Sequence, residues 1–171
     1  MKAVFLDRDG VINIDKKFVY KICDFQFIDG VFDALKYLIN KKFNLFIVTN
    51  QSGIGRKLYT IKDFEKVNNW MINKFLDEKI IINEVQFCYH HPDDNCDCRK
   101  PKTGMIDEIL KNNNIDLNQS WLIGDKNIDM ELAINSKIKN KIQVKSGKYF
   151  DERESKADFI IDSIKDIKKI I

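Results

Sequence analysis

The stretch Val4-Phe5-Leu6-Asp7-Arg8-Asp9-Gly10-Val11 decides the fold. Its apolar first half is typical of a buried parallel strand, and its polar second half is typical of the turn where such a strand leaves the sheet. Ligand sites of open parallel sheets lie beyond the carboxyl ends of the strands. Asp7 and Asp9 repel each other unless a cation joins them, so the pattern D-x-D-G predicts a metal site. The simpler interpretation, an Asp-rich turn without a function, has to be weighed against the rest of the chain.

The composition sets limits on the class of protein. A length of 171 residues with 44% hydrophobic residues suits one globular domain, which we expect to span residues 1–171. The net charge of +3 gives no reason to expect a nucleic-acid partner, and no apolar stretch is long enough to cross a membrane. The first strand begins at once, without a charged and apolar leader, so we expect a cytoplasmic protein. Few apolar surface stripes are evident, which favours a monomer.

Strand patterns alternate with helix patterns along the whole chain. Buried strands are predicted at 44–49, 84–89, 121–124 and 142–144, with a terminal strand and helix. Helices are predicted from Gly30 to Ile39, from a capping box at Thr60 to Glu78, over 104–111 and after Asp129. The prediction is a single Rossmann-like α/β domain with a parallel sheet and right-handed crossovers. The segment Asn13–Phe27 is too short for a cap domain and is interpreted as a flap near the mouth of the site.

Polar side chains follow four of the predicted strands. They are Asp7 and Asp9 after the first, Thr49, Asn50, Gln51 and Ser52 after the second, Arg99 and Lys100 after the third, and Asp125, Lys126 and Asp129 after the fourth. Each set alone has a structural interpretation as a strand end, a turn or a surface pair. Together they provide carboxylates for a divalent cation, a fixed positive charge and hydrogen-bond donors, which is what phosphoryl transfer requires.

The chain resembles the haloacid dehalogenase superfamily of phosphatases. The matching stretches are D-R-D-G-V at 7–11, I-V-T-N-Q-S-G-I-G-R at 47–56, C-R-K-P-K at 98–102 and I-G-D-K-N-I-D-M at 123–130. Within the superfamily it is similar to the cap-less heptose bisphosphate phosphatases, which also share F-x-F-I-D-G-V, here at 25–31. The resemblance implies removal of the C7 phosphate of a heptose 1,7-bisphosphate, in the synthesis of heptose precursors for lipopolysaccharide or surface glycans.

The resemblance also implies a role for each matching residue. Asp7 would attack phosphorus, Asp9 would act as general acid and base, and Thr49 and Lys100 would hold the phosphoryl oxygens. Mg²⁺ would be held by Asp7, the backbone carbonyl of Asp9 and Asp125, and Asp129 would orient Lys126 or a metal-bound water. The implied contacts to the sugar or its second phosphate are Asp15, Lys16, Lys17, Phe18, Asn50, Gln51, Ser52, Arg99 and Lys126. The chain departs from the family at Lys17 and Phe18, where a glycine and a tyrosine are common.

A cysteine and histidine cluster lies between the third strand and Arg99. Three thiols and an imidazole form a closed tetrahedral set for a structural zinc ion, and a disulfide or idle thiols are the alternatives. The spacing alone does not choose between His90 and His91, but the family pattern C-x-H favours His90. The expected Zn²⁺ ligands are therefore Cys88, His90, Cys96 and Cys98. Cys23 stands apart and is expected to be a semi-buried thiol.

Two other functions compete with this one. A histidinol-phosphate phosphatase shares the motifs and has a similarly short zinc loop. A zinc-stabilised binding module that has lost catalysis is the alternative from a different class, and the intact set Asp7, Asp9, Thr49, Lys100 and Asp125 argues against it.

Overall fold

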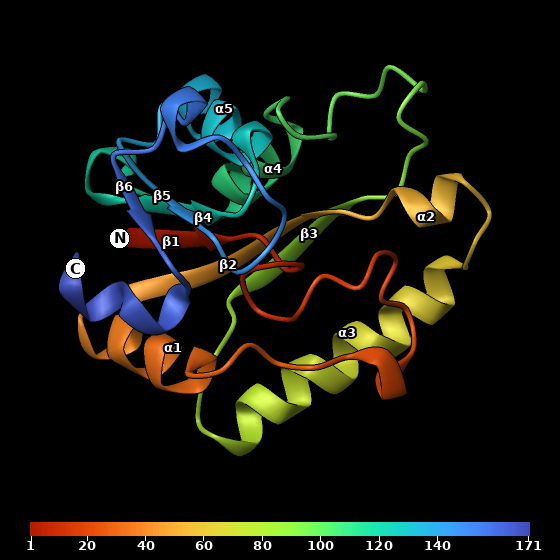
Figure 1. Cartoon of the computed structure of the whole chain (residues 1–171), viewed down its shortest axis with the longest axis horizontal. Helices are drawn as coiled ribbons and strands as arrows, with labels where there is room; N and C mark the ends of the chain where they lie inside the picture. Colours follow the sequence, from red (N-terminus) through yellow and green to blue (C-terminus); the bar gives the residue numbers. More distant parts are fainter.

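β1 (Lys2–Leu6) lies at the centre of a six-stranded sheet in the computed structural model, which describes residues 1–171 (Figure 1). Every neighbouring pair of strands is parallel, and the order is β3-β2-β1-β4-β5-β6. The other strands are β2 (Phe43–Asn50), β3 (Glu84–Cys88), β4 (Trp121–Gly124), β5 (Asn140–Val144) and β6 (Phe159–Ile161). The predicted class, a single α/β domain with a parallel sheet, is confirmed.

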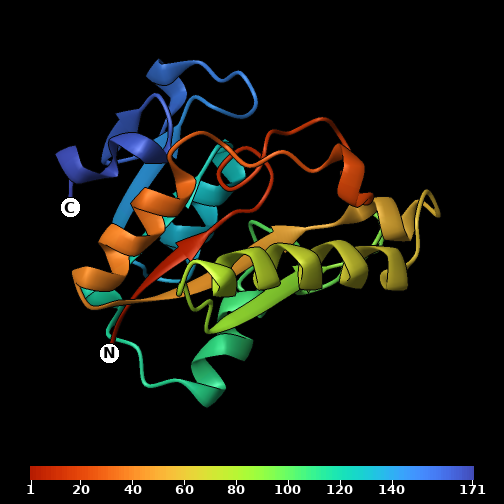
Figure 2. The same ribbon diagram turned by 90° about the horizontal axis from the view of Figure 1, so that it is seen from below.

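Helices cover both faces of this sheet. α1 (Val31–Asn40) and α3 (Ile61–Asp77) pack on one face, and α4 (Gly104–Asn112) and α5 (Asn127–Asn135) on the other (Figures 1 and 2). Each face has its own buried apolar cluster, because alternate side chains of a strand point to opposite sides. The remaining helical segments are the one-turn helix α2 (Ser52–Gly55) and four 3-10 helices, η1 (Ile22–Asp24), η2 (Leu117–Gln119), η3 (Glu152–Glu154) and η4 (Ile164–Lys169).

Local sequence signals explain where two of the helices begin. Thr60 and Asp63 form the predicted capping box of α3, in which the backbone N–H of Thr60 donates to Asp63 Oδ2 at 2.8 Å. Gly30 precedes α1 with φ of +75°, a left-handed conformation. A Cβ at Gly30 would also lie 2.7 Å from the Lys165 side chain, so both its backbone and its packing favour glycine.

The order of the strands places the polar segments at one edge of the sheet. The chain moves outward from β1 through β2 to β3 and then crosses back, so that β4 pairs with the opposite side of β1. The carboxyl ends of β1 and β4 therefore flank a topological switch point, where ligand sites of such sheets occur. The backbone N–H of Asp7 donates to the carbonyl of Ile123 at 2.9 Å, which joins the two strand ends.

The structure differs from the predictions in four places. The polar loop after β2 contains the helix α2, and the last helix is a 3-10 helix. The helical spacing of apolar residues over 60–78 predicts that Leu76 packs against the core, but Leu76 is 49% exposed, and Cys23 is exposed rather than semi-buried. The flap is an extended segment with one 3-10 turn and no inserted domain, as expected for a cap-less chain. No helix has the length and apolarity needed to cross a bilayer.

Candidate active site

A cavity of about 480 Å³ opens at the carboxyl ends of the strands. Residues expected at the site that line it are Asp7, Asp9, Asp15, Lys17, Phe18, Asn50, Gln51, Ser52, Arg99, Lys100 and Lys126. Thr49 and Asp125 are buried and reach the cavity through hydrogen bonds and ion pairs to Gln51 and Lys126. Lys16 is exposed and does not line the cavity, so the structure does not bring it to the other residues.

Lys100 lies at the centre of the site. Its Nζ is 3.0 Å from Asp7 Oδ1, 2.7 Å from Asp129 Oδ1, and donates to the carbonyl of Val48 at 3.0 Å. Burial alone would lower the pKa of Lys100, but the charges of Asp129 and Asp7 outweigh it and raise the pKa. Lys100 is therefore a fixed cation beside the carboxylate of Asp7. Asp129 pairs with the Lys100 side chain through Oδ1, and its Oδ2 accepts from the backbone N–H of Lys126 at 3.0 Å.

Three carboxylates crowd together at the ends of β1 and β4. One oxygen each of Asp7, Asp125 and Asp129 lies within 4.8 Å of the others, and all three residues are buried. Burial and the charges of Asp7 and Asp129 raise the pKa of Asp125 to about 7, although Lys126 Nζ lies 2.8 Å from its Oδ1. Such a cluster of hard oxygen ligands with an excess of negative charge fits a divalent cation such as Mg²⁺.

The carboxylate of Asp9 is held by three neighbours. Arg8, which is fully buried, donates to both of its oxygens at 3.0 to 3.2 Å, while Asn13 and Gln51 donate at 2.9 and 3.1 Å. Burial raises the pKa of Asp9, but the Arg8 charge and these hydrogen bonds outweigh burial and lower the pKa overall. Arg8 also donates to the carbonyl of Val19 at 2.9 Å, so the same guanidinium ties the flap to Asp9.

The two amides after Thr49 are engaged within the protein. Asn50 Oδ1 accepts from the backbone N–H of Lys100 at 3.1 Å, and Asn50 Nδ2 donates to the Lys100 carbonyl at 3.4 Å. Gln51 Nε2 donates to both Asp9 Oδ2 and Thr49 Oγ1, and Gln51 is only 2% exposed. Both side chains were expected to contact the substrate, and the structure shows them holding other residues of the site.

The rim of the cavity carries further positive charge. Lys126 and Lys148 lie 3.9 and 3.5 Å from Asp15 Oδ2, and Arg99 has a buried Nη1 without a protein partner. Lys17 lies in the flap with φ of +59°, a left-handed conformation that glycine adopts more readily than lysine.

Sequence reasoning missed three lining residues, Tyr59, Ile128 and Lys148. Lys148 belongs to the polar loop after β5, so the strand-end argument applied to the other strands would have found it. Tyr59 comes from the loop between α2 and α3, and its sequence neighbourhood contains no signal of this kind.

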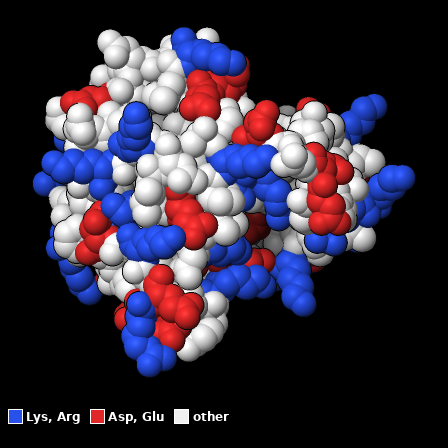
Figure 3. All heavy atoms as spheres, turned by 90° about the horizontal axis from the view of Figure 1, so that it is seen from above, with Lys and Arg blue, Asp and Glu red and all other residues white.

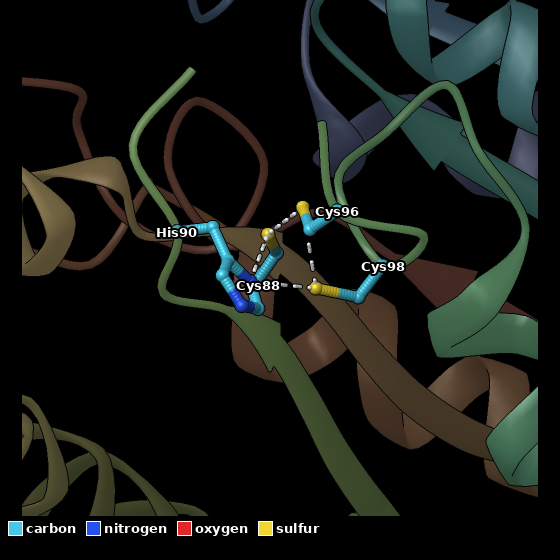
Figure 4. Close-up of side chains that lie close together, drawn as sticks. All are labelled: Cys88, His90, Cys96 and Cys98. Carbon is cyan, nitrogen blue, oxygen red and sulfur yellow. Dashed lines mark hydrogen bonds between the residues drawn. The ribbon is translucent and has the colours of Figure 1, made fainter. Parts of the chain in front are cut away.

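The cysteine cluster comprises Cys88 at the end of β3 and three residues of the loop that joins β3 to α4 (Figure 4). His90 Nδ1 is 3.7 Å from Cys88 Sγ and 3.2 Å from Cys98 Sγ, and Cys96 Sγ is 3.6 and 3.7 Å from the same two sulfurs. Tetrahedral thiolates bound at 2.3 Å to zinc would stand about 3.8 Å apart, so these separations fit the ion. His91 Nδ1 instead lies 3.3 Å from Asp93 Oδ2, and no metal-binding cluster includes it.

Comparisons with known proteins place the chain in a family. The family model described as polynucleotide kinase 3 phosphatase matches residues 3–160. A D-glycero-beta-D-manno-heptose-1,7-bisphosphate 7-phosphatase of Haemophilus ducreyi is 43% identical over 97% of this chain and 96% of its own length. The enzyme of that name from Escherichia coli K12 is 39% identical over 99% of this chain and 93% of its own. The chain belongs to the heptose bisphosphate phosphatase family.

Solved structures agree with this family. The D,D-heptose 1,7-bisphosphate phosphatase of B. bronchiseptica, crystallised with magnesium and phosphate, has a TM-score of 0.84 and 25% identity, covering 99% of this chain and 97% of its own. A haloacid dehalogenase-like protein of Streptococcus pneumoniae, 15% identical over 99% of this chain and 97% of its own, has a TM-score of 0.67 and shows the fold alone. The expected superfamily and the heptose bisphosphate phosphatase resemblance within it are confirmed, and with them the expectation of a phosphatase.

Proposed function

We propose that this chain is a magnesium-dependent phosphatase that removes the C7 phosphate of D-glycero-β-D-manno-heptose 1,7-bisphosphate. The observation that carries the proposal is the ion pair of Asp7 with Lys100 at the switch point of the sheet. A carboxylate cannot approach a phosphate unless positive charge cancels their repulsion, and Lys100 is a buried cation next to that carboxylate. Relatives that are about 40% identical carry this activity in their names.

The proposed reaction has two steps. Asp7 attacks phosphorus and forms an aspartyl-phosphate as the bond to the C7 oxygen breaks, and Asp9 gives a proton to that oxygen. Asp9 then takes a proton from water, which attacks the aspartyl-phosphate and releases phosphate and free Asp7. Contacts with Arg8, Asn13 and Gln51 keep Asp9 ionised in the free protein, so Asp9 has to take up its proton as the negative charge of the substrate arrives.

Both metals are part of this proposal. Mg²⁺ would be held by Asp7, the Asp9 carbonyl and Asp125, and its chemistry is to neutralise phosphoryl oxygens as they gain charge. Lys100 and Thr49 hold the phosphoryl oxygens, with Asp129 positioning Lys100. Zn²⁺, held by Cys88, His90, Cys96 and Cys98, would fix the loop that leads directly into Arg99 and Lys100.

The second phosphate distinguishes this substrate from the alternatives. Lys17, Arg99, Lys126 and Lys148 line the cavity in addition to Lys100, and these five cations outnumber the three lining carboxylates, Asp7, Asp9 and Asp15. Histidinol phosphate carries one phosphate and a positive amine, so this rim fits it less well. On the face shown in Figure 3, basic side chains border a hollow, and elsewhere acidic and basic side chains are mixed rather than gathered into the broad basic surface that nucleic acids require. The monomeric state and the cytoplasmic location stay predictions.

A substrate panel tests the proposal. The panel contains both anomers of heptose 1,7-bisphosphate, histidinol phosphate and a 3′-phosphorylated oligonucleotide, each with Mg²⁺. We expect kcat/KM to be highest for the β-anomer, by about 100-fold over histidinol phosphate, since histidinol phosphate has no second phosphate for the rim cations to bind. Asp7→Asn should remove all turnover. If histidinol phosphate or the oligonucleotide is preferred, the substrate assignment is wrong, and if Asp7→Asn stays active, Asp7 is not the nucleophile.

A further inference from the structure

The hydrogen bonds around Gln51 run in one direction. Tyr59 Oη donates to Gln51 Oε1 at 2.6 Å, and Gln51 Nε2 donates to Asp9 Oδ2 at 3.1 Å and to Thr49 Oγ1 at 2.9 Å. Gln51 thus uses both N–H groups on two residues of the proposed reaction. In the reverse orientation of the amide, its oxygen would face the Asp9 carboxylate, and two acceptors at that distance repel.

Tyr59 fixes the orientation of this amide from the other end. Its hydroxyl is the group that meets Gln51 Oε1, and burial together with the charge of Asp9, only partly opposed by Arg8, raises the pKa of Tyr59 to about 12. The hydroxyl therefore keeps its proton and remains a donor. The position of the ring is fixed as well, because it stacks on Tyr20 of the flap with centroids 4.9 Å apart and planes at 7°. A Cβ at Gly53 would lie 2.0 Å from the ring, so glycine leaves the space that the ring fills.

The direction of these bonds determines what Thr49 can do. A hydroxyl has one proton, and Thr49 Oγ1 already accepts from Gln51, so its proton is free for another acceptor. In the proposed reaction that acceptor is a phosphoryl oxygen. The same Gln51 nitrogen holds Asp9 Oδ2, which leaves the position of the Asp9 carboxylate dependent on the amide.

We propose that Tyr59 is a positioning residue that acts through Gln51, locking the amide so that Asp9 and Thr49 keep the orientations needed for leaving-group protonation and phosphoryl binding. This inference rests on the proposed function for the roles of Asp9 and Thr49. Tyr59 lines the cavity, but its hydroxyl donates to Gln51, so Tyr59 acts through that amide and is not a catalytic residue.

The test compares two leaving groups. A sugar alkoxide leaves only with a proton from Asp9, whereas 4-nitrophenolate leaves without one, so loss of Asp9 positioning selectively slows the sugar phosphate. Tyr59→Phe removes the hydroxyl and keeps the ring. We expect kcat for the sugar phosphate to fall by about tenfold, the scale of one lost buried hydrogen bond, with a several-fold smaller loss for 4-nitrophenyl phosphate. Inorganic phosphate should also inhibit the Tyr59→Phe variant less strongly, because Thr49 would no longer be oriented to bind a phosphoryl oxygen.

Two controls separate positioning from a general loss of structure. Tyr37→Phe removes a hydrogen bond of similar length, in which the Tyr37 hydroxyl donates to the Ile171 backbone oxygen at 2.7 Å. Neither residue lines the cavity, so both activities should be unchanged. In the background of Gln51→Leu, the change Tyr59→Phe should have no further effect, because its partner is gone.

The outcomes distinguish this inference from the proposed function. Equal losses on both substrates, no loss with Tyr59→Phe, or additive losses in the double variant would overturn the role of Tyr59 while the phosphatase activity of the unaltered protein stands. If the unaltered protein hydrolyses a different sugar phosphate, the same comparison is made with that ester, and only the substrate assignment fails. A protein that hydrolyses neither ester refutes the proposed function and this inference together.

Discussion

Gly147 packs so closely against Asp125 that a Cβ on the glycine would lie 2.1 Å from Asp125 Oδ2. The next residue donates its backbone N–H to the same oxygen, Lys148 N to Asp125 Oδ2 at 2.8 Å. The loop after β5 therefore positions the carboxylate of Asp125, and residue 147 has to be glycine because its backbone lies so close to that carboxylate.

Gly147→Ala should displace Asp125 and impair the proposed magnesium site. The added methyl group cannot fit, so either the loop or the carboxylate has to move. We expect Mg²⁺ affinity to fall by about tenfold or more, the scale of losing support for a metal ligand, as measured by the Mg²⁺ dependence of turnover. Ser146→Ala is the matched control, since Ser146 lies in the same loop as Gly147 and the change removes only its hydrogen bond to the Gly10 carbonyl. Unchanged Mg²⁺ affinity in Gly147→Ala would show that this support is unnecessary.

Magnesium should stabilise the protein more at high pH than at low pH. The pKa of Asp125 rises from its usual 3.8 to about 7 on folding, so the folded state holds this proton more tightly than the unfolded state. For the metal-free protein, this group contributes stability that is present below about pH 4 and is lost as pH rises through 7, with a total of about 4 kcal/mol. Thermal unfolding from pH 5 to pH 8, with and without Mg²⁺, measures the stabilisation by Mg²⁺ at each pH. Asp125→Asn should make that stabilisation less dependent on pH. A Mg²⁺ effect that is independent of pH in this range would contradict the prediction.

Asp9→Asn should remove turnover and leave Mg²⁺ binding nearly intact. Only the backbone carbonyl of residue 9 is proposed as a ligand, so the change of side chain should abolish proton transfer and spare the metal site. Arg8 loses its ionic partner and stays fully buried, which should cost about 3 kcal/mol of stability. Asp7→Asn should cost less, because Lys100 keeps Asp129. Calorimetry with Mg²⁺ and thermal unfolding test both parts, and loss of metal affinity in Asp9→Asn would refute the division of roles.

Asn50→Ala should lower phosphate affinity without changing the metal content. Asn50 binds both the N–H and the carbonyl of Lys100, so its loss frees the segment that carries Lys100. We expect kcat/KM to fall by about tenfold, since small displacements of a positioning group have effects of this size. The comparison is with Asn44→Ala, which loses a hydrogen bond to the Lys2 carbonyl at the opposite end of the same strand. If both variants behave alike, Asn50 has no special role.

Loss of the proposed zinc ion should lower phosphate affinity while the domain remains folded. Cys98→Ser deletes one member of the four-residue cluster immediately before Arg99 and Lys100. We expect zinc content near zero and kcat/KM lower by about 10- to 100-fold, while the sheet remains folded. Cys23→Ser, at an exposed thiol outside the cluster, should have neither effect. Full activity in zinc-free protein would remove the proposed role of the ion.

The strand ends could be predicted from the sequence, but the bonds between side chains could not. Asp7 and Asp125 come directly after β1 and β4, and parallel topology gathers such positions, whereas Lys100 lies farther along, at the end of the cysteine loop that follows β3. The assignment of Asn50 and Gln51 to substrate contact depended on their place next to Thr49. In the structure Asn50 also bonds Lys100 and Gln51 also bonds Asp9, and both partners are distant in the sequence. Tyr59 does not follow a strand, so its sequence position gave no reason to expect it at the site. It reaches Gln51 because its ring packs against Gly53 of α2. Lys16 points to solvent, since the left-handed residues Lys17 and Phe18 turn the flap at that point.

The sheet register pairs Cys88 of β3 with Asn50 of β2, so the cysteine cluster begins directly beside the residue that holds the backbone of Lys100. Peroxide that converts Cys96 or Cys98 to a sulfenic acid would remove a thiolate from the cluster. Arg99 and Lys100 follow Cys98 directly in the sequence. Oxidation of the cluster would therefore be expected to displace these two residues, which the proposal assigns to phosphate binding. If the cluster holds Zn²⁺ as proposed, the protein would need a reducing environment both to keep the ion and to keep Arg99 and Lys100 in place for catalysis.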